Sequence, residues 1–230
     1  MWKIVLFASL LPTVIAIVLR KFFCERALKK MRHGVTNQTG ERVAAQMLRY
    51  QEGMKETEVK QAKKTRLVSG DVLRIDLSRK MWEGKTILDL GKVANLVGRA
   101  CVAKEHGDLL AWRDWAVRFG WAFPAFTLLV VVFAVAVAKL GVLIGLVIVS
   151  CALGLSSTLL LLTMTVELEA AKRGAYLVEK SHALPRPADG EEVAKCCRAL
   201  AWKRVVPGVL EWAVGGSNKA ERNSLETEGE

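Results

Sequence analysis

The sequence predicts a mainly α-helical protein that has three transmembrane helices and a mixed α+β region on the cytoplasmic side of the membrane. Two observations lead to this class. The chain has 230 residues, of which 52% are hydrophobic. Its charges are segregated, because residues 4–19, 119–138 and 140–166 contain none. Together these features exclude a soluble globular protein and a disordered chain, and five cysteines are too few for a secreted module held by disulfides.

The charge-free segments match the length of a membrane crossing. A hydrocarbon core of about 30 Å takes about 20 helical residues. Residues 119–138 have that length and residues 140–166 exceed it, so we expect the latter helix to tilt or protrude. The two form a hairpin that turns at Lys139, because a lysine at the bilayer centre would cost roughly 3 kcal/mol. Residues 4–19 are followed by basic residues rather than by a small-residue cleavage site, which predicts a retained anchor and not a signal peptide.

The distribution of basic residues predicts the orientation. All of them except Lys3 and Lys139 fall in residues 20–118 and 167–230. The positive-inside bias places both segments in the cytoplasm and the N-terminus outside, as in a multi-pass protein of the cytoplasmic (inner) membrane. The net charge of +11 is concentrated near anionic lipid headgroups, so the expected partner is the lipid bilayer and not nucleic acid. The predicted organisation is an anchor (1–22), a cytoplasmic region (23–118), a transmembrane hairpin (119–166), a partly interfacial helical region (167–214) and a disordered tail (215–230).

Hydrophobic periodicity predicts the elements outside the membrane. A helix is expected over residues 36–50, and a solvated helix or loop over the charged residues 51–66. Residues 71–78 alternate apolar and polar side chains, which predicts a strand. Residues 191–210 are expected to be helical. The apolar residues 205–214 are too few to span a membrane, so we expect them to lie in its interface.

A long helix is predicted over residues 87–105, with Thr86 as its N-terminal cap. No His-x-x-x-His, phosphate-binding loop or Cys-x-x-Cys pattern occurs in the chain. The pattern of the helix is that of an amphipathic helix with one solvated face. Its expected core positions are Ile87, Leu90, Ala94, Val97 and Cys101, and its expected solvated positions are Asp89, Lys92, Asn95 and Arg99.

Four segments of the chain follow one another in a recognisable order. They are Gly34-Val-Thr-Asn-Gln-Thr-Gly40, Leu73-Arg-Ile-Asp-Leu-Ser78, Ala94-Asn-Leu-Val-Gly-Arg-Ala100 and Val166-Glu-Leu-Glu-Ala-Ala-Lys-Arg173. An N-terminal membrane helix precedes them, and a hydrophobic hairpin separates the last two. This order resembles the membrane-bound neutral zinc metallopeptidases of bacteria. The resemblance covers roughly residues 1–205 and implies a zinc-peptidase-like unit of helices and a strand or hairpin on the cytoplasmic side.

The resemblance also implies where a metal site would lie. In that family the helix after the strand carries His-Glu-Val-Gly-His, whose histidines bind zinc from one helical face while the glutamate activates the bound water. In this chain the frame of the motif is kept, but the two ligand positions hold Asn95 and Arg99 and the general-base position holds Leu96. The family's third, acidic ligand corresponds to Glu167 or Glu169.

These replacements predict a site without catalysis. An amide oxygen is a poor exchange for imidazole at zinc, leucine cannot accept a proton, and the fixed charge of arginine repels a cation. We therefore expect no catalytic residue, no metal and no other cofactor. Our hypothesis is that Arg99 forms an ion pair with Glu167 or Glu169 and so replaces the metal as a cross-link. The alternative is that Arg99 extends to lipid headgroups.

The predicted function is that of an inactive member that binds or scaffolds a protein partner or client in the membrane, or serves as a subunit of an assembly. A homo-oligomer is compatible with small residues such as Gly141 and Gly145 in the second hairpin helix. Two alternatives stay open. One is a working zinc metallopeptidase with atypical ligands, for which Cys101, His106 and His182 are the candidates. The other is a scaffold that binds lipid surfaces through its basic face.

Overall fold

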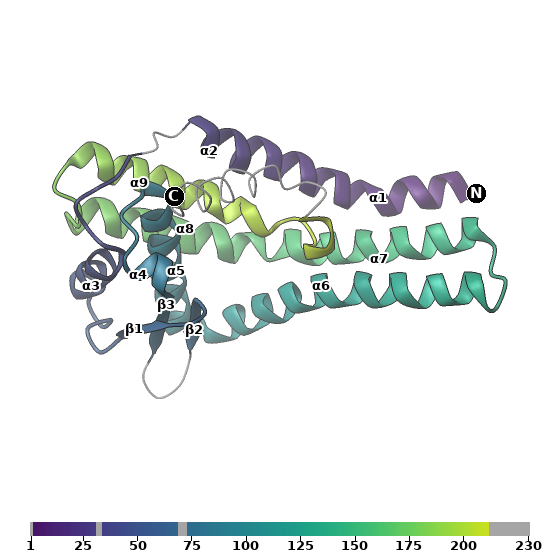
Figure 1. Ribbon diagram of the computed structural model, residues 1–230, viewed down its shortest axis with the longest axis horizontal. Helices are drawn as coiled ribbons and strands as arrows, with labels where there is room; N and C mark the ends of the chain where they lie inside the picture. Colours follow the sequence, from purple (N-terminus) through teal and green to yellow (C-terminus); the bar gives the residue numbers. More distant parts are fainter. Residues whose placement is uncertain (1, 31–33, 69–72, 212–230) are drawn as a thin grey trace, which may run out of the picture. The chain divides into compact units, whose positions relative to one another are not determined.

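The computed structural model describes residues 2–30, 34–68 and 73–211, and most of them are helical (Figure 1). The chain divides into two compact units. One contains residues 2–21, 115–162 and 204–211 of the described chain, and we call it the hydrophobic unit. The other contains Phe22–Asp114 and Thr163–Lys203, and we call it the polar unit.

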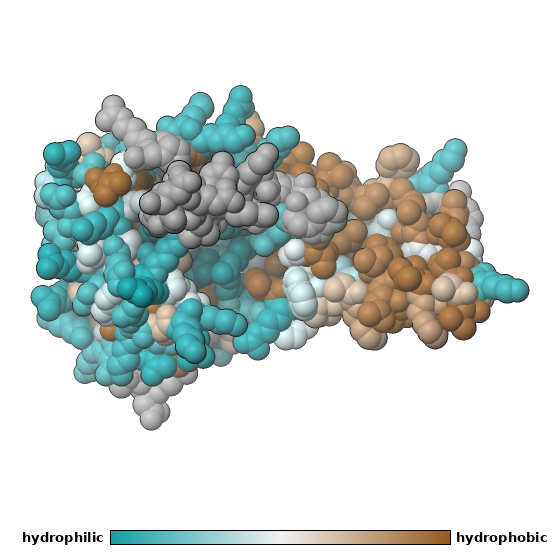
Figure 2. All heavy atoms as spheres, viewed as in Figure 1, coloured by the Kyte–Doolittle hydropathy of each residue, from teal (hydrophilic) through white to brown (hydrophobic). Residues whose placement is uncertain are grey.

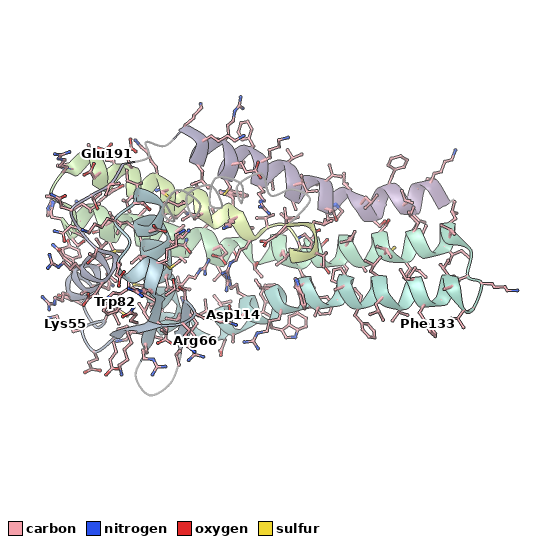
Figure 3. The ribbon with its side chains drawn as sticks, in the orientation of Figure 1. Lys55, Arg66, Trp82, Asp114, Phe133 and Glu191 are labelled. Carbon is pink, nitrogen blue, oxygen red and sulfur yellow. The ribbon has the colours of Figure 1, made fainter. Side chains whose placement is uncertain are left out.

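The hydrophobic unit is built from α1 (Trp2–Leu19), most of α6 (Gly107–Ala136) and α7 (Val142–Leu162). Figure 2 shows hydrophobic side chains over the visible surface of these helices. Phe133, for example, is 66% exposed and points away from the neighbouring helix (Figure 3). Such exposure would be unfavourable in water, but it is the expected surface of helices surrounded by lipid. Three helices of the described chain are long and apolar enough to cross a membrane, as the sequence predicts.

Small residues let α1 and α7 approach closely. A Cβ on Gly154 would lie 2.0 Å from the backbone oxygen of Ser9, so this position accepts no larger side chain. One turn away, the hydroxyl groups of Thr13 and Ser157 are hydrogen-bonded at 2.9 Å, and both side chains are buried. The predicted turn at Lys139 is confirmed, since this residue connects α6 to α7 with a φ of 53°. Close backbone contact and a buried hydroxyl pair are the usual means of packing helices in lipid.

The second helix of the hairpin continues beyond the length of a membrane crossing. A single turn at Thr163 separates α7 from α8 (Met164–Lys180), and together Val142–Lys180 contains 39 residues. At 1.5 Å per residue this length is about twice what a hydrocarbon core requires. The expectation that this helix tilts or protrudes therefore stays a prediction, and α8 belongs to the polar unit.

The polar unit contains helices around a small three-stranded sheet. Its chain enters through a π-helical turn (Arg20–Glu25) that joins α1 to α2, and it leaves through a 3-10 turn (Trp202–Arg204), which a second such turn (Gly208–Leu210) follows. The elements between them, besides α8, are α2 (Arg26–Lys30), α3 (Gly40–Tyr50), β1 (Glu58–Ala62), β2 (Arg66–Val68), β3 (Arg74–Ser78), α4 (Arg79–Trp82), α5 (Ile87–Glu105) and α9 (Pro187–Ala201).

The sheet has the order β1-β3-β2, with β1 parallel and β2 antiparallel to β3. The central strand β3 lies within the predicted 71–78, and its Ile75 and Leu77 are fully buried. The prediction of a solvated helix or loop over 51–66 is wrong for residues 58–62, which form β1. This strand is an edge strand whose side chains are mostly polar and exposed, so it shows no apolar alternation that would identify it.

Helix α5 has the predicted bounds, and the side chain of Thr86 accepts a hydrogen bond from the backbone N–H of Asp89 at 3.1 Å. The predicted core positions on this helix are buried. The predicted solvated face is wrong, because Asp89 and Asn95 are 6% and 4% exposed. Helices α8 and α9 both pack against α5. They cover its polar face, which the sequence predicts to be exposed to solvent.

The C-terminal helix begins earlier and ends sooner than the sequence predicts. Instead of residues 191–210, α9 covers Pro187–Ala201, and a 3-10 turn follows. Pro187 occupies the first helical turn, where its missing N–H costs nothing. Of the predicted interfacial segment 205–214, only residues up to 211 are described, and the predicted disordered tail 215–230 lies outside the described residues.

Candidate functional site

The candidate site lies where α5 and α8 cross within the polar unit, and two glycines set their separation. A Cβ on Gly98 of α5 would lie 1.9 Å from the backbone oxygen of Ala170 on α8. A Cβ on Gly174 of α8 would lie 2.3 Å from the backbone oxygen of Ala94 on α5. The glycine between Asn95 and Arg99 is therefore required by backbone contact, whatever its neighbours do.

Glu167 lies in the first turn of α8, and its side chain is only 3% exposed. Its Oε2 accepts hydrogen bonds from Arg99 of α5, at 3.1 Å from Nε and 2.8 Å from Nη2. The Arg99 side chain is 14% exposed, so this ion pair is largely removed from water. Two donors of one guanidinium on one carboxylate hold both side chains in a fixed geometry, and charged hydrogen bonds of this kind are the strong ones.

The other carboxylate oxygen of Glu167 is also occupied. Its Oε1 accepts a hydrogen bond from Nε of Arg113 at 2.6 Å, and Nη2 of the same guanidinium is paired with it. Arg113 belongs to the first turns of α6 and is 5% exposed. It also pairs with Asp114, which Figure 3 labels. The cluster of Arg99, Arg113, Asp114 and Glu167 thus contains two positive and two negative charges, and it connects α5, α6 and α8.

The remaining motif positions are filled without ionisable groups. Leu96 is 6% exposed and belongs to the hydrophobic core of the polar unit. Asn95 is buried beside Cys197 of α9. Burial raises the pKa of the Cys197 thiol to about 12, although the Asn95 amide and the Arg99 guanidinium act in the opposite direction. At neutral pH this sulfur is therefore a protonated thiol, and it donates a hydrogen bond to the backbone oxygen of Ala171.

The second acidic candidate, Glu169, takes part in a different network. It accepts a hydrogen bond from Arg173 at 3.0 Å, and Arg173 also pairs with Glu105 at 2.6 Å. Glu169 and Glu105 are each 48% exposed, so these are surface ion pairs of small energetic weight. The structure therefore brings Arg99 together with Glu167, while Glu169 binds to a cation on its own helix.

The candidate replacement ligands for zinc are not gathered at the site. His106 caps the C-terminus of α5, and His182 follows α8 with a φ of 50°; both are exposed. Cys101 is 4% exposed, and burial raises the pKa of its thiol to about 11. Within residues 2–30, 34–68 and 73–211 there is no group of three His, Cys, Asp or Glu side chains that could hold a metal ion.

The residues present do not fit a zinc ion. Protein zinc sites use three or four ligands from His, Cys, Asp and Glu. At this site Asn95, Leu96 and Arg99 supply an amide, a hydrocarbon and a guanidinium, and only Glu167 is of the right type. Both oxygens of that carboxylate already accept hydrogen bonds from guanidinium groups. A divalent cation would have to displace two fixed positive charges to bind there.

These features define a mainly helical protein in which α5 and α8 cross in close backbone contact and are joined by buried ion pairs. Comparison with protein families identifies the class more narrowly. The chain belongs to the family described as "Putative neutral zinc metallopeptidase", whose family model matches residues 3–210. No curated protein matches the chain, and no solved structure does.

The sequence pattern did not indicate Arg113 or its partner Asp114 as members of this cluster. Arg113 lies six residues before the start of the charge-free segment at residue 119, between Trp112 and Asp114. An arginine just before a transmembrane segment is ordinarily interpreted as a residue that flanks the membrane boundary. The one indication in the sequence is that Glu167 lies just after the third charge-free segment, so the two ends of the hairpin carry opposite charges.

Proposed function

We propose that this chain is a catalytically inactive member of its family that acts in the cytoplasmic membrane as a binding, scaffold or assembly subunit. The observation that carries the proposal is the occupation of both Glu167 oxygens by Arg99 and Arg113. In a zinc peptidase the acidic ligand, two histidines and a general base act on one water molecule. Here the acidic group serves as the acceptor of a buried ion-pair cluster.

Two further points support loss of catalysis. Leu96 cannot take a proton from water, so general-base chemistry is closed at this position. The described histidines, His106 and His182, are exposed and lie outside the cluster. What the cluster does provide is a connection between α5, α6 and α8 within the polar unit. A stable unit attached to membrane helices is suited to holding a partner or a client protein.

The test is metal analysis of the full chain purified from membranes in mild detergent. We expect no zinc in the wild-type protein after dialysis against zinc-containing buffer. The variant Asn95→His, Leu96→Glu, Arg99→His, Arg113→Gln restores the family pattern on α5 and removes both guanidinium groups from Glu167. We expect it to retain zinc, because Gly98 already sets the separation of α5 and α8. Stoichiometric zinc in the wild type, together with peptide cleavage that a chelator abolishes, would overturn the proposal and favour a working peptidase.

The binding role is tested separately in native membranes. The wild-type chain is cross-linked in intact cells, solubilised and compared by native electrophoresis with the mass of 25.4 kDa expected for one copy. We expect a larger, defined species that contains a partner protein or further copies of the chain. Migration as a single copy under all cross-linking conditions would argue against an assembly role.

A further inference from the structure

A groove of about 450 Å³ lies within the polar unit, between the segment that follows α1 and the C-terminal half of α9. The two segments lie side by side (Figure 1), and they are in contact through α2 and α9. One end of the groove is aromatic. There the rings of Phe23 and Trp202 are stacked with their centres 4.7 Å apart, and Phe23 is 43% exposed. Ala27 and Ala199 line the groove beside these rings.

The other end of the groove is positively charged. It is lined by Lys30 on α2 and by Lys195 and Arg198 on α9, with Glu192 as the single carboxylate, so the lining carries a net charge of +2. Glu191, labelled at the start of α9 in Figure 3, lies 3.7 Å from Lys195, and Glu179 lies 3.4 Å from Arg198. All four of these side chains are more than 40% exposed. Exposed pairs at such distances contribute little, so they can yield to a stronger anion.

Along the first candidate span, the groove residues change from aromatic to cationic, as a membrane surface changes from hydrocarbon to lipid phosphate. A hydrocarbon core of about 30 Å takes about 20 helical residues, and counting these from Ile4 along the first candidate span, Lys3–Lys30, reaches Phe23. Lys30 lies seven residues further, or about 10 Å along a helix. A lipid headgroup layer is roughly 5–8 Å thick on each side of the core. The aromatic end of the groove is therefore expected at the edge of the hydrocarbon, and the cationic end at the depth of the phosphates.

We propose that this groove binds one anionic phospholipid. The lipid phosphate lies against Lys30, Lys195 and Arg198, and the start of an acyl chain packs on Phe23 and Trp202. Charge complementarity selects an anionic over a zwitterionic headgroup, and the aromatic end selects a lipid over free phosphate. The inference rests on the membrane placement contained in the proposed function, but it does not depend on the loss of the metal site.

The experiment uses the full chain in nanodiscs that contain equal amounts of phosphatidylglycerol and phosphatidylcholine. Lipids retained after transfer to detergent are counted by native mass spectrometry. We expect the wild type to retain phosphatidylglycerol in preference. The groove variant Lys30→Gln, Lys195→Gln, Arg198→Gln should lose this preference by roughly tenfold to a hundredfold. The control variant Lys55→Gln, Lys63→Gln, Lys64→Gln removes the same charge from exposed residues elsewhere in the polar unit and should retain the lipid like the wild type.

Three outcomes would overturn the inference. The wild type could retain both lipids equally, the groove variant could retain phosphatidylglycerol like the wild type, or millimolar inorganic phosphate could displace the lipid completely. Alkaline carbonate extraction of the cell membranes from which the chain is purified tests the membrane placement separately from this inference. A chain that carbonate removes from the membrane contradicts both. A chain that stays in the membrane without preferring phosphatidylglycerol contradicts only the lipid site.

Discussion

We propose that Arg99 takes the place of a metal ion as the structural cross-link between α5 and α8. A zinc ion joins helices through several ligands at about 2 Å, whereas a guanidinium joins them through planar hydrogen bonds near 3 Å. Arg99 makes two such bonds to Glu167, and Arg113 approaches the same carboxylate from α6. Removing these charges from water is costly, and this cost offsets their mutual attraction. The stabilising effect of the cluster therefore shows mainly when one member is removed, because the remaining buried charges then lack a counter-charge.

We therefore expect Glu167→Gln to lower the free energy of unfolding by about 3–5 kcal/mol, because two largely buried guanidinium groups lose their counter-charge. Denaturant unfolding of the purified chain in micelles measures the effect. The matched control is Glu169→Gln, two residues along the same helix, whose ion pair with Arg173 is exposed; its effect should stay below about 1 kcal/mol. Equal effects of the two substitutions would show that the cluster has no special role.

At the residue scale, the sequence predicts part of the site. The family pattern assigns Asn95, Leu96 and Arg99 to the motif helix and Glu167 or Glu169 to the acidic position, and the structure places Arg99 2.8 Å from Glu167. The choice between the two acidic residues depends on the rotation of α8, which is set by its tertiary packing against α5 and α9. Arg113 could not be inferred, because its contact with Glu167 depends on the tertiary packing of α6.

At the scale of elements, the crossing of α5 and α8 depends on the absence of a side chain at Gly98. Gly98→Ala would place a methyl group 1.9 Å from a backbone oxygen, so one helix must move. We expect a loss of about 1–3 kcal/mol or more in the free energy of unfolding. Gly190→Ala in α9 is the control, because its Cβ would meet nothing within 4 Å; there a helical alanine should stabilise by about 0.5–1 kcal/mol. Thermal unfolding of both variants provides the comparison, and similar midpoints would contradict the proposed tight crossing.

The sheet contains a second buried carboxylate, Asp76 on β3, which accepts hydrogen bonds from Arg66 at 2.8 Å and Arg74 at 2.9 Å. Arg66, on the edge strand β2, is labelled in Figure 3. The hydrogen bond from Arg66 is the largest cause that lowers the pKa of Asp76 below its ordinary value of 3.8; Arg74 adds to it, and burial opposes both. A lowered pKa means that the folded state favours the ionised carboxylate. This contribution to stability is present above the ordinary pKa and is lost as the pH falls through the lowered value.

Asp76→Asn should therefore destabilise the chain near neutral pH, by about 1–3 kcal/mol, because two charged hydrogen bonds are weakened. The difference in unfolding free energy between this variant and the wild type should shrink as the pH falls below about 4, because Asp76 of the unfolded wild-type chain takes up a proton there before Asp76 of the folded chain does. Urea unfolding at several pH values measures it. A difference that stays constant down to about pH 2 would show that the charge of Asp76 is not what stabilises the sheet.

The elements themselves were predictable to different degrees. The bounds of α5 follow from its cap at Thr86 and its periodic apolar residues, and the structure agrees with them. Strand β1 could not be predicted, because it is an edge strand whose side chains are mostly polar and exposed. The buried polar face of α5 was missed because Asp89 and Asn95 suggest solvent, whereas α8 and α9 from the far end of the chain cover them.

At the scale of the whole molecule, the distribution of charge predicts which segments face the cytoplasm. Lys139 lies in the turn between α6 and α7, and we expect that turn on the outer side of the membrane. A membrane-impermeant maleimide should label Lys139→Cys in intact cells. Lys63→Cys, in the polar unit, should be labelled only after the membrane is permeabilised. The reverse pattern would invert the proposed orientation. Background from native thiols should be low, because Cys24, Cys101, Cys196 and Cys197 are buried and Cys151 lies within a candidate span.

The ion-pair cluster at Glu167 has a consequence for where this chain can operate. A coordinated ion is exchangeable: its occupancy follows the supply in the cell and the competition from other binding proteins. The cations of this cluster, Arg99 and Arg113, are covalently part of the chain and are present from the moment of its synthesis. If the proposed loss of the metal site holds, we expect the polar unit to fold without nutrient metal, so that the chain is produced and inserted even under starvation for trace elements.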